Sequence, residues 1–285
     1  MLLLDDLRLH RPERLERALT LRAELGDDAA LYAGGTELLL AMKVGVLSYE
    51  HLIDVKRLPE LRGIERRDGV LRIGAATTHR QLEHDPAVAA VLPALAALER
   101  NVANVRVRAA GTLGGNLAFA EPHADPPALL AALGARVELA GADGARTLAI
   151  DDFLLDAFET ALADDEILVA VEVPIPAPEV RVAYRKVAIL ERPTVGVAVA
   201  AAIVDGLFAD EPAIVVGAVD ERPIRVDAAA LAGAALDDAD ALAAVAAAAR
   251  DLVDPVDDLS GSADYKRHLT EVTVRRTLLT LGEGR

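Results

Sequence analysis

The sequence contains no cysteine and no tryptophan, and only 3% of its residues are aromatic. The absence of cysteine excludes disulfides, zinc–thiolate sites, cysteine nucleophiles and cysteine-ligated iron–sulfur clusters from this polypeptide. Any such cluster must therefore be held by another chain. Because aromatic side chains are so few, the core must be built from Ala, Leu, Val and Ile, and no aromatic surface is available for stacking on bases.

Basic residues are outnumbered by acidic ones, 30 to 46, so the net charge is −16. A field of this sign repels phosphate backbones and anionic membranes, and nucleic acid is not expected as a partner. An anionic cofactor could bind only where backbone N–H groups or a few cations locally override the overall field.

Long apolar runs are also missing. The longest, residues 195–204, is shorter than the roughly 20 residues that span a bilayer. Residues 1–6 lack the basic segment and the apolar stretch of a secretory signal. We therefore expect a cytoplasmic protein without a membrane span.

Residues that usually carry catalysis are sparse. Serine occurs only at positions 48, 260 and 262, and none lies in a G-x-S-x-G turn. The six histidines form no i, i+4 pair, so the sequence gives little support to a metal site. We interpret His79 and His84 as surface or capping residues. No acid–base pair or nucleophile stands out.

An α+β fold is predicted by the mixture of hairpins and helices along the first 175 residues. Apolar spacing predicts helices over residues 12–26 and 86–99, and Thr36 is expected to cap a helix through about Lys43. Hairpins are predicted for residues 63–67 with 70–75 and for 136–140 with 146–150. Thr78 and Gln81 form a predicted capping box, whereas residues 102–118 are interpreted as irregular backbone between short strands.

Prolines at positions 174, 176 and 178 mark the predicted domain boundary, because proline interrupts strands and helices alike. The expected domains are residues 1–175, with subdomains of about 1–55 and 56–175, and residues 179–285. In the second domain, strands are predicted near residues 182–190, 195–204 and 213–219, and helices at 238–252 and 262–281.

Two glycine-rich loops are the strongest candidates for binding. Residues 33–36, Ala-Gly-Gly-Thr, follow a predicted strand and supply permissive backbone and N–H groups that suit a phosphate. Residues 111–116, Gly-Thr-Leu-Gly-Gly-Asn, add a hydroxyl and an amide. Taken alone, the first loop is more often an ordinary tight turn than a phosphate site, so one such loop decides nothing, whereas two could clamp a diphosphate from both sides. Neither matches G-x-G-x-x-G or G-x-x-x-x-G-K-[ST], so a Rossmann site and a P-loop are not supported.

A third candidate is the acidic segment 120–125, Ala-Glu-Pro-His-Ala-Asp. Its acids and histidine could bind a ligand, or they could form a solvated loop in which Asp125 caps the helix that starts at Pro126. The surviving hypothesis is a binding site for a phosphorylated cofactor that carries the chemistry itself.

Residues 33–38, 73–78 (Ile-Gly-Ala-Ala-Thr-Thr) and 108–118 (Arg-Ala-Ala-Gly-Thr-Leu-Gly-Gly-Asn-Leu-Ala) resemble, in order and spacing, the FAD-binding medium subunit of molybdenum hydroxylases. This is the family of carbon monoxide dehydrogenase and xanthine dehydrogenase. Residues 184–186 and 261–276 also resemble its C-terminal domain. The resemblance implies an FAD-binding domain of two α+β subdomains, followed by a domain with a three-stranded antiparallel sheet and helices.

The resemblance also implies a set of cofactor-binding residues. Residues 33–38 would cradle the FAD diphosphate, the second loop would grip it from the other side, Asp125 would bind toward ribityl or ribose hydroxyls, and Lys186 would lie near the flavin ring. The implied FAD site consists of Ala33, Gly34, Gly35, Thr36, Glu37, Leu38, Thr112, Gly114, Gly115, Asn116, Asp125 and Lys186.

The implied function is electron transfer within an oxidoreductase complex. A large subunit with the molybdenum cofactor would hydroxylate the substrate, and a small subunit with 2Fe-2S clusters would pass electrons to the flavin. The external acceptor would be NAD, a quinone or another molecule. Two alternatives stay open: a stand-alone FAD-dependent oxidoreductase, and a non-catalytic binding or assembly protein that has lost FAD.

One departure from the family concerns residues 192–196, Arg-Pro-Thr-Val-Gly. Many relatives carry an acid and then an aromatic residue here, and the aromatic side chain can cover the flavin. We expect the aliphatic Val195 to take that place, which would leave the ring more open.

Overall fold

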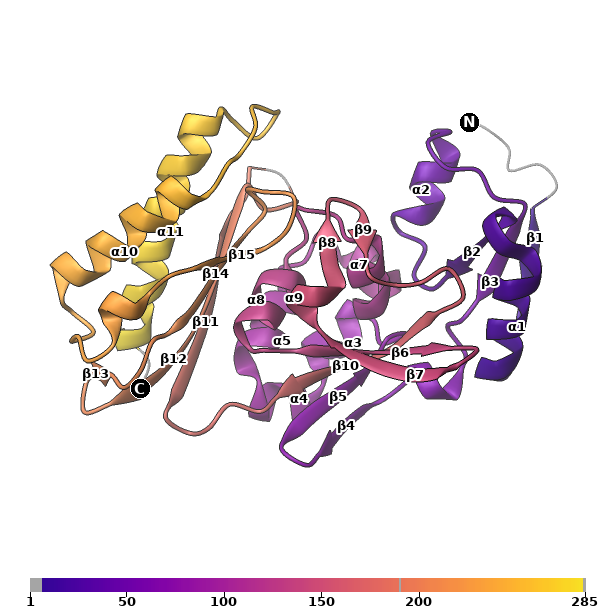
Figure 1. Cartoon of the computed structure of the whole chain (residues 1–285), viewed down its shortest axis with the longest axis horizontal. Coiled ribbons are helices and arrows are strands. Elements are labelled where there is room, and N and C mark those ends of the chain that lie inside the picture. Colours follow the sequence, from indigo (N-terminus) through magenta and orange to yellow (C-terminus); the bar gives the residue numbers. More distant parts are fainter. Residues whose placement is uncertain (1–6, 190, 284–285) are drawn as a thin grey trace.

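The computed structural model describes residues 7–189 and 191–283. The chain begins with a small parallel sheet of order β1-β3-β2, which lies at the opposite end of the molecule from the C-terminal helices (Figure 1). Strands β2 and β3 pair in parallel, from Ala29 opposite His51 to Tyr32 opposite Asp54. The elements of this region are β1 (Arg8–His10), α1 (Leu15–Leu25), the 3-10 turn η1 (Gly26–Asp28), β2 (Ala29–Tyr32), α2 (Leu38–Lys43) and β3 (His51–Asp54).

Helix α1 is the helix predicted over residues 12–26. It buries Ala18 and Leu21 against the sheet. Gly26 ends it because its φ of 52° leaves the helical region, and its N–H donates to the carbonyl of Arg22.

A five-stranded antiparallel sheet of order β4-β5-β10-β6-β7 forms the middle of the molecule. Both predicted hairpins are confirmed. The first turns at Asp68 and Gly69, whose φ angles of 47° and 79° suit a two-residue hairpin turn. The strands are β4 (Ile64–Arg67), β5 (Val70–Gly74), β6 (Arg136–Gly141), β7 (Gly144–Ala149) and β10 (Ile167–Pro174); β8 (Leu154–Asp156) and β9 (Glu159–Thr160) form a separate hairpin.

Helices connect and cover this sheet. The capping box of Thr78 and Gln81 is confirmed at the start of α3. The single helix predicted over residues 86–99 is wrong: the chain forms two helices that meet at Leu92. Pro93 forces this break, because a residue before proline is pushed out of the helical conformation, and Leu92 has φ −137° and ψ 59°. The segments are η2 (Pro59–Leu61), α3 (His79–His84), α4 (Pro86–Val91), α5 (Pro93–Arg100), α6 (Val105–Ala110), α7 (Leu113–Phe119), α8 (Pro126–Ala132) and α9 (Ile150–Phe153).

The irregular backbone predicted for residues 102–118 is also wrong, because α6 and α7 occupy most of it. Side-chain caps explain the two helices. Asn104 accepts from the N–H groups of Arg106 and Val107, and Thr112 accepts from that of Gly115. The low helix propensity of the paired glycines concealed α7 in the sequence.

The C-terminal region contains a second antiparallel sheet, of order β11-β12-β14-β15, with β13 paired to β12. The three-stranded sheet implied by the resemblance corresponds to the long strands β11, β12 and β14. The sheet is larger than expected because two short segments extend the ladder. Its elements are β11 (Val180–Val187), β12 (Val195–Val204), β13 (Leu207–Phe208), β14 (Ala213–Gly217), β15 (Ile224–Val226), η3 (Ala229–Leu231), α10 (Ala239–Leu252) and α11 (Ala263–Glu283).

Strand β12 is buried on both faces. Val195, Val197 and Val199 pack in one core with residues of α10 and α11, whereas Ala198 belongs to the core of the preceding region. Figure 1 shows α10 and α11 along the outer face of the sheet. On the inner face, a Cβ on Gly217 would lie 3.1 Å from that of Ala128 in α8. Small residues therefore let α8 pack closely against this sheet.

A buried pair joins α3 to α5. Nδ1 of His79 lies 2.6 Å from Oε2 of Glu99, and the two side chains are 3% and 0% exposed. The interpretation of His79 as a surface or capping residue is thus wrong. Burial alone would lower the pKa of His79, but the charge and hydrogen bond of Glu99 and the charge of Asp125 outweigh burial and the opposing charge of Arg108, and raise it.

Among the helices of residues 7–189 and 191–283, none is long and apolar enough to cross a bilayer.

The close packing of α8 predicts that Ala128→Leu will destabilise the protein. The larger side chain has no space against Gly217 and should lower the free energy of unfolding by about 1–3 kcal/mol. Urea unfolding followed by far-UV circular dichroism measures this. Ala248→Leu, on an exposed position of α10, is the control and should change little. Equal stability of both variants would contradict the close-packed interface.

The His79–Glu99 pair predicts a pH-dependent stability. Because the folded-state pKa of His79 is raised above 6.5, its contribution is complete below pH 6.5 and is lost as the pH rises through the folded value. Urea midpoints measured between pH 6 and 9 should fall less with pH in His79→Gln than in the parent. His84→Gln, at an exposed position of the same helix, should leave the parent profile unchanged. Identical profiles for all three proteins would contradict the prediction.

Candidate functional site

The loop between β2 and α2 carries a run of backbone N–H donors. Gly35 has a φ of 70°, which turns the chain sharply after the strand. Within the part of the chain that the structure describes, no acceptor is found for the N–H groups of Gly34, Gly35, Thr36 and Glu37. A run of backbone N–H groups of this kind is a binding site for an anion.

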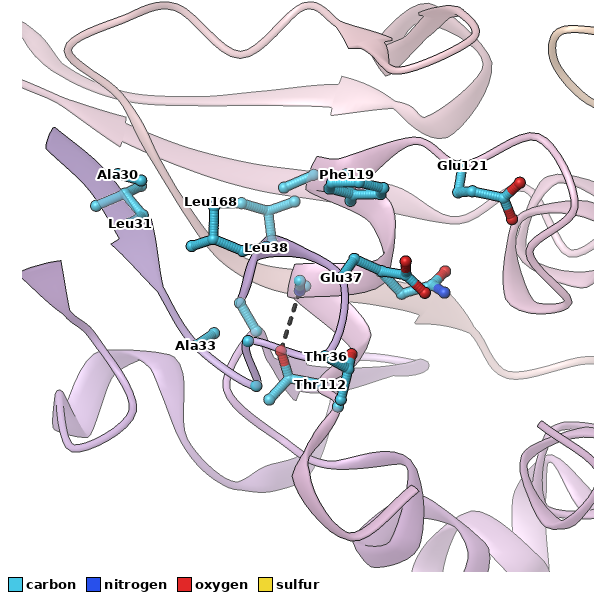
Figure 2. Close-up of a pocket in the computed structure, with 18 of the residues that line it drawn as sticks. Ala30, Leu31, Ala33, Thr36, Glu37, Leu38, Thr112, Phe119, Glu121 and Leu168 are labelled. Carbon is cyan, nitrogen blue, oxygen red and sulfur yellow. Dashed lines mark hydrogen bonds between the residues drawn. The ribbon is translucent and has the colours of Figure 1, made fainter. Parts of the chain in front are cut away.

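Thr36 does not cap α2, so that prediction is wrong. The helix begins at Leu38, and the residue at its cap position, Glu37, makes no side-chain capping bond. The Thr36 side chain instead lines a cavity, beside Thr112 in Figure 2.

The first glycine loop lies directly against the second. A Cβ on Gly34 would lie 2.5 Å from the carbonyl oxygen of Ala110 and 2.6 Å from Cα of Gly111. No side chain fits between these two backbones. Gly34 therefore allows the two loops, one after β2 and the other between α6 and α7, to meet.

In the second loop, most backbone N–H groups already donate to other atoms of the protein. The N–H of Gly114 donates to the carbonyl of Ala75 at 2.9 Å, and a Cβ at this position would clash with Ala75. The N–H of Gly115 donates to Oγ1 of Thr112 at 3.0 Å. Asn116 differs, because its Oδ1 is buried and has no hydrogen-bond partner among the described residues. A buried acceptor without a donor is costly, and a ligand with N–H or O–H groups would satisfy it.

A cavity of about 620 Å³ lies over both loops. Eleven of the twelve predicted site residues line it: Ala33, Gly34, Gly35, Thr36, Glu37, Leu38, Thr112, Gly114, Gly115, Asn116 and Asp125. An apolar wall of Ala30, Leu31, Leu38, Phe119 and Leu168 completes one side (Figure 2). Apart from Leu38, sequence reasoning missed these wall residues, because apolar side chains on strands and helices carry no signal that distinguishes a ligand wall from a core.

Asp125 is the centre of a buried polar cluster. Its Oδ1 accepts from the Tyr184 hydroxyl at 2.8 Å, and its Oδ2 lies 3.0 Å from Nζ of Lys186. Lys186 also donates to the carbonyl of Asn101 at 2.7 Å. Lys186 is thus the one predicted residue that is not on the cavity wall, yet it contacts a residue that is. Gly196 leaves space for this arrangement, because a Cβ there would lie 2.7 Å from the Tyr184 hydroxyl.

The surroundings of this cluster shift the pKa values of Asp125 and Tyr184. Burial raises the pKa of Asp125, although Lys186 and Tyr184 oppose the shift. Burial and the neighbouring charge of Asp125 raise the pKa of Tyr184 well above its ordinary value. Asp125 makes no side-chain cap to α8, so its carboxyl group is committed to β11 instead.

Val195 does not cover the cavity, contrary to expectation. Its side chain is fully buried in the core that β12 forms with α10 and α11. The register explains the error, since Val195 is paired with Val187 and points to the helical side of the sheet. Glu191 and Arg192, from the loop that precedes β12, line the cavity.

Comparisons with known families divide the chain into two matches. Residues 5–176 match the family described as the FAD binding domain in molybdopterin dehydrogenase, and residues 179–281 match the carbon monoxide dehydrogenase flavoprotein C-terminal domain.

Similar proteins are medium subunits of several enzymes. The carbon monoxide dehydrogenase medium chain of Hydrogenophaga pseudoflava is 37% identical over 275 residues, which cover 94% of each chain. The nicotine 6-hydroxylase medium subunit of Paenarthrobacter nicotinovorans is 33% identical and covers 98% of each.

Solved structures agree with these matches. A carbon monoxide dehydrogenase chain from Hydrogenophaga pseudoflava superimposes with a TM-score of 0.95 at 36% identity, covering 99% of both chains. Quinoline 2-oxidoreductase from Pseudomonas putida 86 gives 0.92 at 31% identity, covering 98% of this chain and 97% of that one. The chain therefore belongs to the FAD-binding medium subunits of the molybdenum hydroxylase family, oxidoreductase subunits whose cofactor is FAD.

Proposed function

We propose that this chain is the electron-transfer subunit of a molybdenum hydroxylase complex, with FAD bound in the 620 Å³ cavity. It would take electrons from the 2Fe-2S clusters of a small subunit and pass them to an external acceptor, while a large subunit carries the molybdenum cofactor. The observation that carries the proposal is the group of four N–H donors at residues 34–37 that have no acceptor among the described residues, in a chain of this family.

The residues of the cavity fit the cofactor. The N–H groups of residues 34–37 would hold the FAD diphosphate. Their partial positive charges attract the anionic diphosphate, which the net negative charge of the chain would otherwise repel. Asn116 would accept a hydrogen bond from the cofactor through Oδ1, which finds no donor in the described part of the chain. We assign Gly114 and Gly115 a packing role beside the diphosphate, since their N–H groups are occupied. Ala33, Leu38 and Thr112 would complete the cradle.

Asp125 and Lys186 would face the flavin end of the cofactor. In their ion pair, Nζ of Lys186 lies 3.0 Å from Oδ2 of Asp125, so the lysine charge and its protons are held at a fixed position beside the cavity. The bound flavin supplies the redox chemistry, since it exchanges electrons singly with one partner and in pairs with another. The protein binds and orients it and keeps its surroundings fixed.

We also propose that the functional units are residues 1–175, with subdomains of about 1–55 and 56–175, and residues 179–285. The cavity takes residues from all three units.

Two observations favour a subunit over the alternatives. The chain has no cysteine to hold an iron–sulfur cluster, so clusters would have to reside on a partner. The similar proteins are named as subunits or chains of larger enzymes. A binding or assembly protein without FAD is not favoured either, because the donors of the first loop are retained.

The first test is Thr36→Asp. A carboxylate at this position would compete for the unpaired N–H groups and repel the diphosphate, raising the FAD dissociation constant about 100-fold. Titration of the apoprotein with FAD, followed by flavin fluorescence, measures this. Thr36→Val keeps the shape without the charge and should bind at least tenfold more tightly than Thr36→Asp. Unchanged affinity in Thr36→Asp would place the diphosphate elsewhere.

The second test concerns partners. The purified chain loaded with FAD should not turn over carbon monoxide, aldehydes or purines, since no substrate site for them is proposed on it. Its flavin should nevertheless be reduced by dithionite. Addition of the large and small subunits should confer turnover of the substrate that the large subunit accepts. Turnover by the chain alone would instead identify a stand-alone oxidoreductase.

A further inference from the structure

An arginine from the C-terminal region bridges two acids on the cavity wall. Arg192 belongs to the loop between β11 and β12. Its Nη2 lies 2.9 Å from both carboxylate oxygens of Glu37, and its Nη1 lies 3.1 Å from Oε1 of Glu121. All three residues line the cavity, and Figure 2 shows Glu37 and Glu121 on the same side of it.

The same loop has a second attachment next to this one. Nδ2 of Asn104 donates to the two carboxylate oxygens of Glu191 at 3.0–3.1 Å. Asn104 caps α6 and is therefore itself fixed. Two consecutive residues of the loop thus contact the region that carries both glycine loops.

The cavity wall is strongly acidic. Asp27, Glu37, Glu121, Asp125, Asp164, Glu166 and Glu191 line it, but Arg22 and Arg192 are the only lysine or arginine side chains among the described lining residues. Arg22 is occupied by the carbonyls of Gly26 and Ala29. Asp125 and Glu166 have their own cations in Lys186 and Arg146. Arg192 is thus the cation that compensates Glu37 and Glu121.

Glu121 is held in its charged form. Burial raises the pKa of Glu121. The hydrogen bond from His123 and the charge of Arg192 lower it by more than burial raises it, so the net shift is downward. Its side chain is only 10% exposed, so solvent screens this charge weakly. Without Arg192, a buried carboxylate and Glu37 would face the cavity beside the N–H groups of residues 34–37.

We propose that Arg192 is a cofactor-retention residue, supplied by the C-terminal region, that neutralises Glu37 and Glu121 so that an anionic diphosphate stays bound in the cavity. This inference rests on the proposed position of FAD. It adds that retention of the cofactor depends on a contact between the N-terminal and C-terminal domains, made by Glu37 and by Arg192, 155 residues later.

The test is the rate at which the purified full chain releases FAD. Holoprotein is diluted, and the rise in fluorescence of free FAD is followed with time. Arg192→Gln should release FAD about tenfold faster than the parent. Arg192→Lys should lie between them, because one ammonium group cannot reproduce the forked contact with two carboxylates.

A charge rescue separates this electrostatic role from a purely structural one. Removing the more buried of the two carboxylates that lose Arg192, in Arg192→Gln/Glu121→Gln, should slow release back toward the parent rate. Arg225→Gln is the matched control. Arg225 also links the C-terminal region to the rest of the chain, through Asp151 at 2.6 Å and the carbonyl of Ala131, but it does not line this cavity. Its release rate should equal that of the parent.

Equal release rates in Arg192→Gln and the parent would overturn the inference, as would fast release that Glu121→Gln does not slow. The position of FAD is tested separately. Loss of FAD in Thr36→Asp together with normal release in Arg192→Gln would reject only the role of Arg192. Normal binding in Thr36→Asp would reject the position of the cofactor.

Discussion

The backbone of Gly34 lies against the backbone of Ala110 and Gly111, and the cavity depends on this contact. A Cβ on Gly34 would approach the carbonyl of Ala110 to 2.5 Å, so a side chain there would force the two loops apart. The contact joins the parallel sheet at the start of the chain to the helices that cover the central sheet. It brings the N–H groups of residues 34–37 to the same cavity as Oδ1 of Asn116, and none of these atoms has a hydrogen-bond partner within residues 7–189 and 191–283.

Charge sets the second constraint on this chain. A protein of net charge −16 that binds an anionic cofactor must supply its attraction locally. Backbone N–H groups do this without adding a titratable group, and they cost no side-chain entropy. Four of the acids on the wall have cationic partners: Lys186 pairs with Asp125, Arg146 with Glu166, and Arg192 with Glu37 and Glu121. Two of these cations, Lys186 and Arg192, come from the C-terminal region, so a cavity built mainly by the first 176 residues depends electrostatically on the rest of the chain.

Features with a local physical cause could be predicted from the sequence. The hairpin at Asp68 and Gly69 and the capping box at Thr78 depend only on a few neighbouring residues, and both are confirmed. The glycine loops could be recognised because a sharp turn and a close approach both require the missing side chain. Helix α7 could not, because Gly114 and Gly115 disfavour a helix locally and only packing against Ala75 accounts for the first of them.

Features that depend on which way a side chain faces could not be predicted from the sequence. Val195 and Arg192 are three residues apart, yet one lies in a core and the other on the cavity wall. Val195 is the first residue of β12, whereas Arg192 lies in the loop before the strand, and the sequence does not show where that strand begins or which face Val195 takes. The burial of His79 in α3 likewise depends on Glu99, which lies in α5.

Binding of the diphosphate by the N–H groups of residues 34–37 is the central claim about this site. Hydrogen exchange of peptides covering residues 33–38, measured with FAD and with riboflavin, tests it directly. We predict that FAD slows exchange in this segment and that riboflavin, which has no phosphate, does not. Equal protection by both ligands, or none by FAD, would contradict the claim.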